Sequence, residues 1–203
     1  MEWLRVLLNI IFPPRQEALL VASLDHDGVR ALVHVQRSPK GWSLVSYDDP
    51  RVRALVWEAK YHRNHHALIL IGTALSEALA EHIGTTTHCV PIPLSTRRLH
   101  ERGYNQVTEA LKASIRKPLP HILEDALLRT RDTVPQTQLS RKQRLTNVVG
   151  CFAVASEVRT QIHGAHIVII DDVITTGATL AEARLTLLRA GASRVDVLAF
   201  ARS

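Results

Sequence analysis

Two adjacent carboxylates and a hydroxyl-rich turn stand close together in residues 167–179, which read IVIIDDVITTGAT. Ionised carboxylates only accept hydrogen bonds, so Asp171 and Asp172 are suited to holding the 2′- and 3′-hydroxyls of a ribose. The residues that follow combine hydroxyl groups with small side chains: Thr175, Thr176, Gly177, Ala178 and Thr179. Threonine hydroxyls and the free N–H groups at the start of a helix are suited to a phosphate. The segment therefore predicts a site for a ribose 5-phosphate group.

An ordinary connection between a strand and a helix is the alternative interpretation of this segment. A threonine at the N-cap would satisfy the first N–H groups of the helix, and Gly177 would supply a left-handed backbone or a close approach. This alternative leaves Asp171 and Asp172 unexplained, because two adjacent acids at the end of an apolar run have no part in such a cap. We therefore favour the ligand site.

The flanking residues predict the elements that position this segment. His166–Asp171 is a nearly pure apolar run, which is typical of a parallel strand buried on both faces. A helix is expected over Leu180–Arg189 and a last strand over Val195–Ala201. Strands that alternate with helices form parallel sheets, which bind ligands beyond the carboxyl ends of their strands. The pattern thus predicts an α/β fold with the ribose phosphate at that edge.

Further elements are expected upstream. They are helices over residues 49–61, 64–82 and 105–115, strands over residues 89–93, 126–131 and 151–154, a basic loop after Pro93, and a small antiparallel element within residues 19–47. A helix docked on the domain is expected over residues 3–12. We expect residues 1–48 to form an N-terminal extension and residues 49–203 to form the main domain.

The positive charge of the chain is concentrated in one segment. The formal net charge is +6 at pH 7, and the pI is near 9.8. Residues 95–147 hold eleven Lys and Arg against five Asp and Glu, so this segment carries the whole excess. A basic segment favours an anionic ligand such as phosphate, pyrophosphate or nucleic acid, although a solvated charged face has the same composition.

The cysteines and histidines do not predict a metal site. Cys89 and Cys151 are far apart and lack a CxxC partner, so we expect two buried thiols. No HExxH motif or cysteine accompanies three neighbouring histidines, which we expect on the surface: His62, His65 and His66. The apolar residues 3–12 are too short to span a bilayer and lack a cleavage site, so we expect no membrane span and a cytoplasmic location.

Residues 168–179 resemble the phosphoribosyl-pyrophosphate-binding motif of type I phosphoribosyltransferases. Other segments resemble the ComF family: Lys60-Tyr61, VPIPL at 90–94, RRLHERGYNQ at 97–106, RDTVPQ at 131–136 and RLTNVVGCF at 144–152. The resemblance implies a type I phosphoribosyltransferase fold, with a mainly parallel sheet flanked by helices and a small N-terminal α+β extension. In one departure, Gln16 stands where the first cysteine of the family's zinc module is expected, so we expect no zinc.

The resemblance also implies roles for individual residues. Asp171 and Asp172 would hold the ribose hydroxyls, and residues 175–179 the 5′-phosphate. Arginine can bind two phosphate oxygens at once, and the implied pyrophosphate ligands are Arg97, Arg98, Arg102 and Lys142. Arg144 lies in a segment that corresponds to the loop that such enzymes close over their substrate. Arg144 would neutralise the charge of the departing pyrophosphate. Together with Asp171 and Asp172 it forms the candidate catalytic set.

Two functions follow from the resemblance and stay open at this point. The first is an enzyme in which a nitrogen acceptor displaces pyrophosphate from C1 of phosphoribosyl pyrophosphate, which enters as its Mg²⁺ complex; the residues do not identify the acceptor. The second is a non-enzymatic protein that handles single-stranded DNA in natural transformation, with other competence proteins as partners. Aromatic residues on which bases could stack make up only 4% of the chain, and Tyr104 is the main one near the site.

Overall fold

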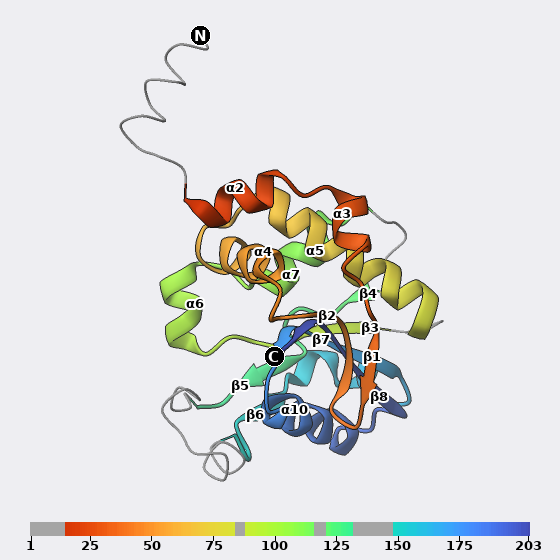
Figure 1. Cartoon of the computed structure of the whole chain (residues 1–203). Helices are drawn as coiled ribbons and strands as arrows, with labels where there is room; N and C mark the ends of the chain where they lie inside the picture. Colours follow the sequence, from red (N-terminus) through yellow and green to blue (C-terminus); the bar gives the residue numbers. More distant parts are fainter. Residues whose placement is uncertain (1–14, 84–87, 116–120, 132–147) are drawn as a thin grey trace.

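The core of the protein is a six-stranded sheet with helices on both faces (Figure 1). The computed structural model describes residues 15–83, 88–115, 121–131 and 148–203, so the helix expected over residues 3–12 lies outside it. The strand order is β1-β2-β8-β7-β3-β4. The strands are Gln36–Ser38 (β1), Gly41–Ser46 (β2), His88–Pro91 (β3), His121–Ile122 (β4), His166–Ile174 (β7) and Arg194–Arg202 (β8). All neighbours pair in parallel except β1 and β2, which form a hairpin, so the predicted mainly parallel sheet is confirmed.

Strand β7 divides its side chains between two hydrophobic cores. Val168 and Ile170 belong to one core and Ile167 and Ile169 to the other, and all four are fully buried. Successive side chains of a strand point to opposite faces, so a continuous apolar run is buried on both sides. The prediction of a central strand over residues 166–171 is confirmed, and β7 continues beyond it to Ile174.

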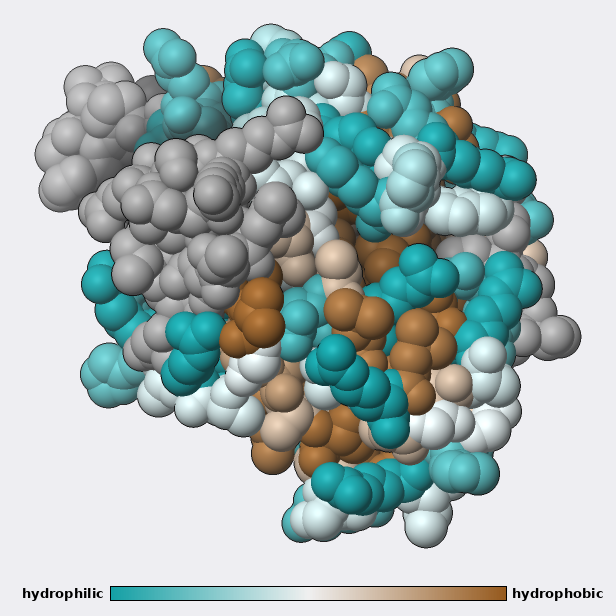
Figure 2. Space-filling view, turned by 90° about the horizontal axis from the view of Figure 1, so that it is seen from below, coloured by the Kyte–Doolittle hydropathy of each residue, from teal (hydrophilic) through white to brown (hydrophobic). Residues whose placement is uncertain are grey.

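Helices form a layer on each face of the sheet. The layer drawn above the sheet in Figure 1 contains α2 (Gln16–Ala22), α3 (His26–Arg30), α4 (Pro50–Tyr61), α5 (His65–Ala78) with its π-helical continuation Leu79–Ile83, and α7 (Gln106–Ala113). Helix α10 (Ala178–Arg189) lies below the sheet, and α9 (Arg159–Ile162) contributes to the same core, following a 3-10 turn at Ser156–Val158. Seen from below, this face shows hydrophobic residues among hydrophilic ones (Figure 2), and the exposed large apolar side chains of α10 are Leu185 and Leu188.

Helices α4 and α5 begin where the sequence predicts them. Asp49 and Asn64 accept hydrogen bonds from backbone N–H groups in the first turns of these helices, as N-cap residues do. Within α5, Gly72 allows a close approach to α7, because a Cβ at this position would come 1.8 Å from the carbonyl oxygen of Ala110. This contact holds α7, and with it Gln106 in its first turn, against α5.

The basic loop expected after Pro93 contains a helix, α6 (Thr96–Arg102). Ser95 caps it by accepting a hydrogen bond from the backbone N–H of Arg98, and Gly103 ends it with a left-handed φ of +75°. A serine N-cap and a glycine after the last turn are common limits of helices. These flanking signals were present in the sequence, but no residue of α6 is buried, so the segment lacks the apolar periodicity that predicts a helix.

The expectation that the strands over residues 126–131 and 151–154 belong to the parallel sheet is wrong. Strand β5 (Leu127–Arg129) pairs antiparallel with β6 (Phe152–Val154) outside the main sheet, and β4 takes the edge beside β3. Leu127 is buried whereas Leu128 is 47% exposed, a one-sided pattern that does not suit a strand covered on both faces. The antiparallel element expected within residues 19–47 is confirmed as the hairpin of β1 and β2, and the residues before it form α2 and α3.

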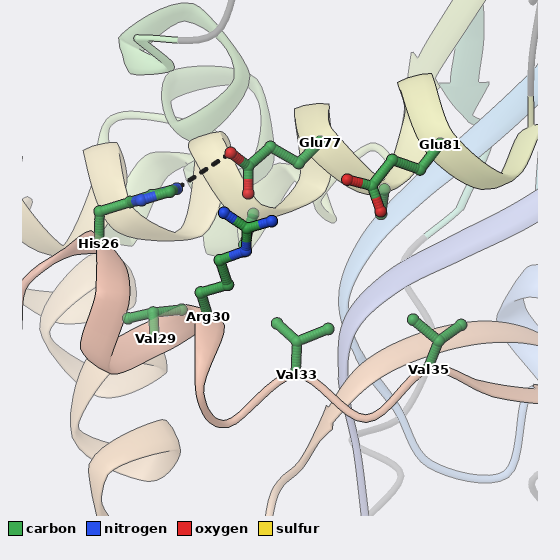
Figure 3. Close-up of a pocket in the computed structure, with 9 residues that line it drawn as sticks. His26, Val29, Arg30, Val33, Val35, Glu77 and Glu81 are labelled. Carbon is green, nitrogen blue, oxygen red and sulfur yellow. Dashed lines mark hydrogen bonds and ion pairs between the residues drawn. The ribbon is translucent and has the colours of Figure 1, made fainter.

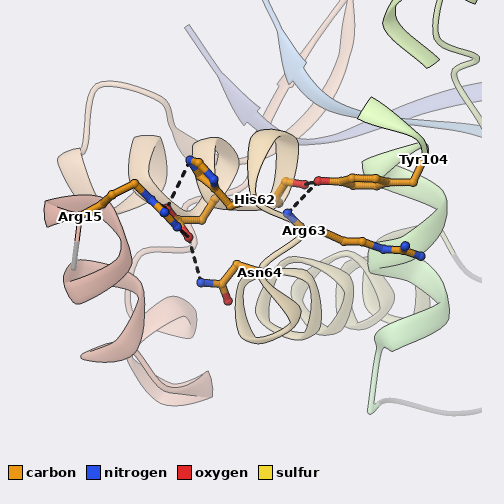
Figure 4. A network of polar contacts seen from close by, with 7 residues as sticks. Arg15, His62, Arg63, Asn64 and Tyr104 are labelled. Carbon is orange, nitrogen blue, oxygen red and sulfur yellow. Dashed lines mark hydrogen bonds and ion pairs between the residues drawn. The ribbon is translucent and has the colours of Figure 1, made fainter. Parts of the chain in front are cut away.

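A buried carboxylate attaches the N-terminal segment to the helical layer (Figure 4). The side chain of Glu58 is 1% exposed and receives two hydrogen bonds from Arg15, at 3.0 and 3.2 Å, and one from Asn64 at 3.0 Å. Burial alone would raise the pKa of Glu58, but the hydrogen bonds from Arg15 and Asn64 outweigh it, so the pKa lies below its ordinary value. This carboxylate therefore stabilises the fold in its ionised form.

We expect Arg15→Gln to lower the melting temperature at neutral pH, because the charge of Glu58 would stay buried without its main partner. The pKa of Glu58 is lowered on folding, so its stabilising contribution is present above the unfolded value of 4.5 and is lost as the pH falls through the folded value. The difference between the two proteins should therefore shrink as the pH falls toward about 4. Thermal unfolding followed by circular dichroism at several pH values measures it.

The control is Arg51→Gln, which removes the partner of Asp49, a carboxylate that is 25% exposed. This variant should lose less stability at neutral pH, because exposed ion pairs contribute little. Equal losses for the two variants would contradict the role given to Arg15.

Candidate ribose-phosphate site

The hydroxyl-rich turn lies between the end of β7 at Ile174 and the start of α10 at Ala178. The two aspartates stand inside β7 rather than at its end, which corrects the predicted strand boundary. Pairing with β3 stops at the register Pro91–Ile170, whereas pairing with β8 continues to Ile174. The carboxyl end of β7 thus extends past the shorter neighbour β3, and the aspartates stand where this extension begins.

The helix α10 begins without a cap from its own N-cap residue. That residue is Gly177, which has a φ of +78° and no side chain with which to cap the helix. The left-handed backbone of Gly177 agrees with both interpretations of the segment, whereas the alternative of a threonine N-cap is not what the structure shows. Thr176 Oγ1 accepts a hydrogen bond of 3.4 Å from the backbone N–H of Ala178. A helix start of this kind offers N–H groups and a partial positive charge to an anion.

The Asp172 carboxylate joins three elements of the fold. The side chain is nearly buried, with Asp172 only 8% exposed. Lys60 from the end of α4 forms an ion pair with its Oδ1 at 3.0 Å, and the Gln106 amide from α7 donates to its Oδ2. Arg102 donates in turn to Gln106 Oε1 at 2.8 Å. Asp172 is therefore already hydrogen-bonded on both oxygens, and its first role is to hold these elements together.

The residues between α6 and α7 all take part in placing Gln106. Gly103 ends α6, and Tyr104 donates its hydroxyl to the Ala59 carbonyl at 2.7 Å while accepting from the Arg63 N–H at 2.9 Å (Figure 4). Asn105 caps α7 through its side-chain oxygen and donates its amide to the Ile92 carbonyl at 2.8 Å. This junction attaches the start of α7 to both α4 and the end of β3.

Asp171 has a different environment from its neighbour. It is half-buried, and its Oδ1 accepts a hydrogen bond of 2.8 Å from the backbone N–H of Asp172. Burial and the negative charge of Asp172 together raise the pKa of Asp171 to about 7. Of the two carboxylates, Asp171 is thus the one whose charge is poorly compensated and which a ligand hydroxyl would stabilise.

The structure places the three predicted arginines on α6 but not equally near Asp172. Arg97 forms an ion pair with Glu101 on the same helix, and the side chain of Arg98 is exposed. Arg102 is half-buried and reaches the Asp172 network through Gln106. Lys142 and Arg144 lie outside the described residues, so their roles stay predictions.

Two lysines that contact β7 or the turn after it did not enter the predicted site. Lys60 was noticed only as part of a family motif, and its ion pair with Asp172 joins residues far apart in sequence. Lys40 comes from the turn of the β1–β2 hairpin, and its ammonium lies 3.4 Å from the carbonyl oxygen of Thr175. Its side-chain methylenes lie against Gly177, where a Cβ would come within 3.1 Å of Lys40 Cγ and Cδ. The dipeptide Pro39-Lys40 signals only a turn, so no local pattern identifies this contact.

The thiols and histidines do not add a reactive group to the site. Cys89 and Cys151 are buried and free, as predicted, and burial raises the pKa of Cys89 to about 12, so its thiol stays protonated. In the described part of the chain, no three His, Cys, Asp or Glu side chains are grouped to hold a metal ion. None of the described helices is both long and apolar enough to cross a membrane.

A hollow lies elsewhere, between α3 and the second half of α5 (Figure 3). Its volume is about 230 Å³, and its walls combine valine side chains with His26, Arg30, Glu77 and Glu81. His26 forms an ion pair with Glu77 at 3.1 Å across one end. None of the residues of the Asp172 network or of the turn after β7 lines this hollow, so it is separate from the candidate site.

The parallel sheet, the two aspartates in β7 and the hydroxyl-rich turn after it define a protein with the type I phosphoribosyltransferase fold. DNA utilization protein YhgH of Salmonella typhi is 33% identical over 181 residues, covering 83% of this chain and 76% of the relative. Competence protein ComFC of Bacillus subtilis is 34% identical over 102 residues, which cover 50% of this chain and 38% of the relative. The chain belongs to the ComF family, which includes these proteins.

No protein-family model matches the chain. Among solved structures, the allosteric regulatory enzyme of purine biosynthesis aligns with a TM-score of 0.43 at 20% identity, covering 70% of this chain and 29% of that chain. The glutamine phosphoribosylpyrophosphate amidotransferase of B. subtilis aligns with a TM-score of 0.42 at 21% identity, covering 70% and 30%.

We expect Asp171→Asn to stabilise the protein at alkaline pH. Folding raises the pKa of Asp171 from 3.8 to about 7, so the folded protein holds this proton more tightly than the unfolded chain. The resulting stability is complete below 3.8 and is lost as the pH rises through about 7. Asparagine has no proton to lose, so the melting temperature of the variant should exceed that of wild type at about pH 8.5 by more than at about pH 5.

Thermal unfolding of both proteins across this pH range checks the prediction. Asp172→Asn is the matched comparison: it weakens the ion pair with Lys60 and should lower the melting temperature. If Asp171→Asn changed the melting temperature equally at both pH values, the proposed burial of its charge would be wrong.

Proposed function

We propose that the protein binds a ribose 5-phosphate group, foremost that of phosphoribosyl pyrophosphate, at the end of β7. The observation that carries the proposal is the unequal environment of the two aspartates. Asp172 is held by Lys60 and Gln106, whereas its neighbour Asp171 is half-buried on the strand that leads into the turn before α10. A sugar hydroxyl donating to Asp171, with the 5-phosphate on the turn at residues 175–179, would satisfy both features.

The chemistry that we propose for this site is transfer of the phosphoribosyl group to a nitrogen acceptor. The acceptor nitrogen forms a bond to C1 as the bond from C1 to the pyrophosphate oxygen breaks, and its electron pair leaves with pyrophosphate as the Mg²⁺ complex. The acceptor releases a proton to solvent. The protein would contribute by positioning the sugar and stabilising charge rather than by a covalent step. Arg102 is the described candidate for the diphosphate, with Lys142 and Arg144 as further candidates.

We expect Asp171→Asn to weaken the binding of ribose 5-phosphate about tenfold or more, since a hydrogen bond to a charged group contributes roughly 1.5–3 kcal/mol. The affinity for inorganic phosphate should not fall, because the turn that would hold it is unchanged. Isothermal titration calorimetry with each ligand measures both. The same titration with phosphoribosyl pyrophosphate and Mg²⁺ tests the proposed ligand directly.

The exposed Asp125 provides the matched control, as Asp125→Asn removes the same charge without touching the site. If wild type bound neither ribose 5-phosphate nor phosphoribosyl pyrophosphate, the proposed function would be wrong. Release of pyrophosphate with a panel of nitrogen bases then separates transfer from binding alone.

A second candidate function, binding of single-stranded DNA, is favoured by two exposed aromatic side chains on α4. Trp57 is 46% exposed and Tyr61 is 52% exposed, and their ring centroids are 4.4 Å apart. Arg102 lies over the Tyr61 ring, 5.1 Å from its centroid, and the exposed Arg53 lies one turn before Trp57. Exposed aromatic rings beside arginines are the usual means of stacking unpaired bases. Two relatives carry DNA utilization or competence in their names.

We expect Trp57→Ala to weaken the binding of a thymine oligonucleotide by about 1–3 kcal/mol for each base that stacks on the ring. The affinity of the Trp57→Ala protein for ribose 5-phosphate should stay unchanged, because Trp57 is not part of the Asp172 network. Fluorescence anisotropy at several salt concentrations measures the effect. The salt dependence should also stay the same, since it reports phosphate contacts.

Leu188→Ala on α10 is the control, because Leu188 is 38% exposed on the opposite helical layer. An oligonucleotide affinity that is the same in wild type and Trp57→Ala would remove α4 as the binding surface. No binding by wild type at low salt would remove the second function altogether.

A further inference from the structure

The turn between β1 and β2 brings a positive charge to the phosphate loop, defined here as residues 175–179. The loop itself carries no cationic side chain. Lys60, a cation on the neighbouring helix α4, is engaged by the Asp172 carboxylate at 3.0 Å. Lys40 lies in the turn between β1 and β2, and its side chain packs against Gly177. Its ammonium lies 3.4 Å from the Thr175 carbonyl oxygen. The contact at Thr175 is at the long limit of a hydrogen bond, so the ammonium is weakly engaged.

The position of this turn is fixed by the end of the last strand. Arg202 donates to the Gly41 carbonyl at 3.1 Å and to Ser43 Oγ at 3.2 Å. Gly41 has a φ of +125° and lies so close to β8 that a Cβ would come 2.7 Å from Val197. Any other residue at Gly41 would push the turn away from the sheet. The hairpin is therefore built to lie where Lys40 meets the loop.

The same strand end also fixes the loop. The backbone N–H of Ser203 donates to the Ile174 carbonyl at 3.1 Å, directly before the loop, and the N–H of Tyr47 donates to the Arg202 carbonyl at 2.7 Å. Residues 202 and 203 thus bind the hairpin on one side and the start of the loop on the other. The distance between Lys40 and the loop is consequently set by backbone contacts as well as by one flexible side chain.

We propose that Lys40 is a ligand of the 5-phosphate, exchanging the Thr175 carbonyl for a phosphate oxygen when the ligand binds. The inference rests on the proposed function, because it concerns the same site. A phosphate near two aspartates needs a compensating cation, and a lysine ammonium binds phosphate as a point charge. Lys40 would make the site selective for a phosphorylated pentose over the free sugar, and it gives the N-terminal hairpin a direct role in ligand binding.

The test compares Lys40→Ala and Lys40→Arg with wild type by isothermal titration of ribose 5-phosphate. We expect about a tenfold loss of affinity for Lys40→Ala, as for one charge-assisted hydrogen bond at an exposed position. Lys40→Arg should retain most of the affinity, because the charge remains. Lys112→Ala is the control for a lost lysine, since Lys112 forms its ion pair with Glu124 outside the site.

A second measurement separates ligand contact from a structural role. Lys40 is acetylated with a dilute, amine-reactive acetylating reagent, and the product is mapped by peptide mass spectrometry. The acetylation should be slower when ribose 5-phosphate is present and should not be slower with ribose. If wild type binds ribose 5-phosphate but Lys40→Ala binds it equally well and acetylation is not slowed, Lys40 is not a ligand although the proposed function stands. If wild type binds no ribose 5-phosphate, both proposals fail together.

Discussion

The contacts of the Asp172 carboxylate connect the helical layer to the sheet at the candidate site. Lys60 comes from the last turn of α4 and Gln106 from the first turn of α7, and both meet Asp172 in β7. A nearly buried carboxylate without such partners would destabilise the fold by several kcal/mol, because its desolvation would be uncompensated. The order of α4, the α6–α7 junction and β7 around one point therefore depends on this group. Tyr104 and Asn105 reinforce the same junction through the Ala59 and Ile92 carbonyls.

This arrangement gives the two aspartates different electrostatic surroundings as well as different contacts. The positive charge of Lys60 is directed to Asp172, so Asp171 experiences burial and a neighbouring negative charge, and its pKa is raised. Raised carboxylate pKa values occur at functional sites, and also in structural ion-pair networks. In this molecule the network contains Asp172, whereas the shifted group is its half-buried neighbour on the strand that leads into a turn that suits an anion. The destabilised group is thus placed where a ligand hydroxyl would relieve it.

Local sequence patterns predicted the helices and strands, but they could not predict contacts between residues that are far apart in the sequence. The apolar run of β7 and the caps Asp49 and Asn64 are each encoded within a few neighbouring residues, so the strand and the two helices were predicted correctly. A left-handed backbone at Gly177 was one of two conformational roles expected there. Gln106 and Asp172 are 66 positions apart, and Lys40 and Thr175 are 135 apart, so no spacing rule relates them. The division of roles between the two aspartates was equally hidden, because it depends on which one Lys60 reaches.

Arg102 makes the two candidate functions of this protein physically dependent on each other. Its guanidinium donates to Gln106, which holds Asp172, and it also lies over the ring of Tyr61 beside Trp57. A diphosphate would draw this guanidinium toward the sugar site, whereas a base stacked on Tyr61 would share it or displace it. One side chain cannot serve both positions fully, so the two ligands would not bind independently.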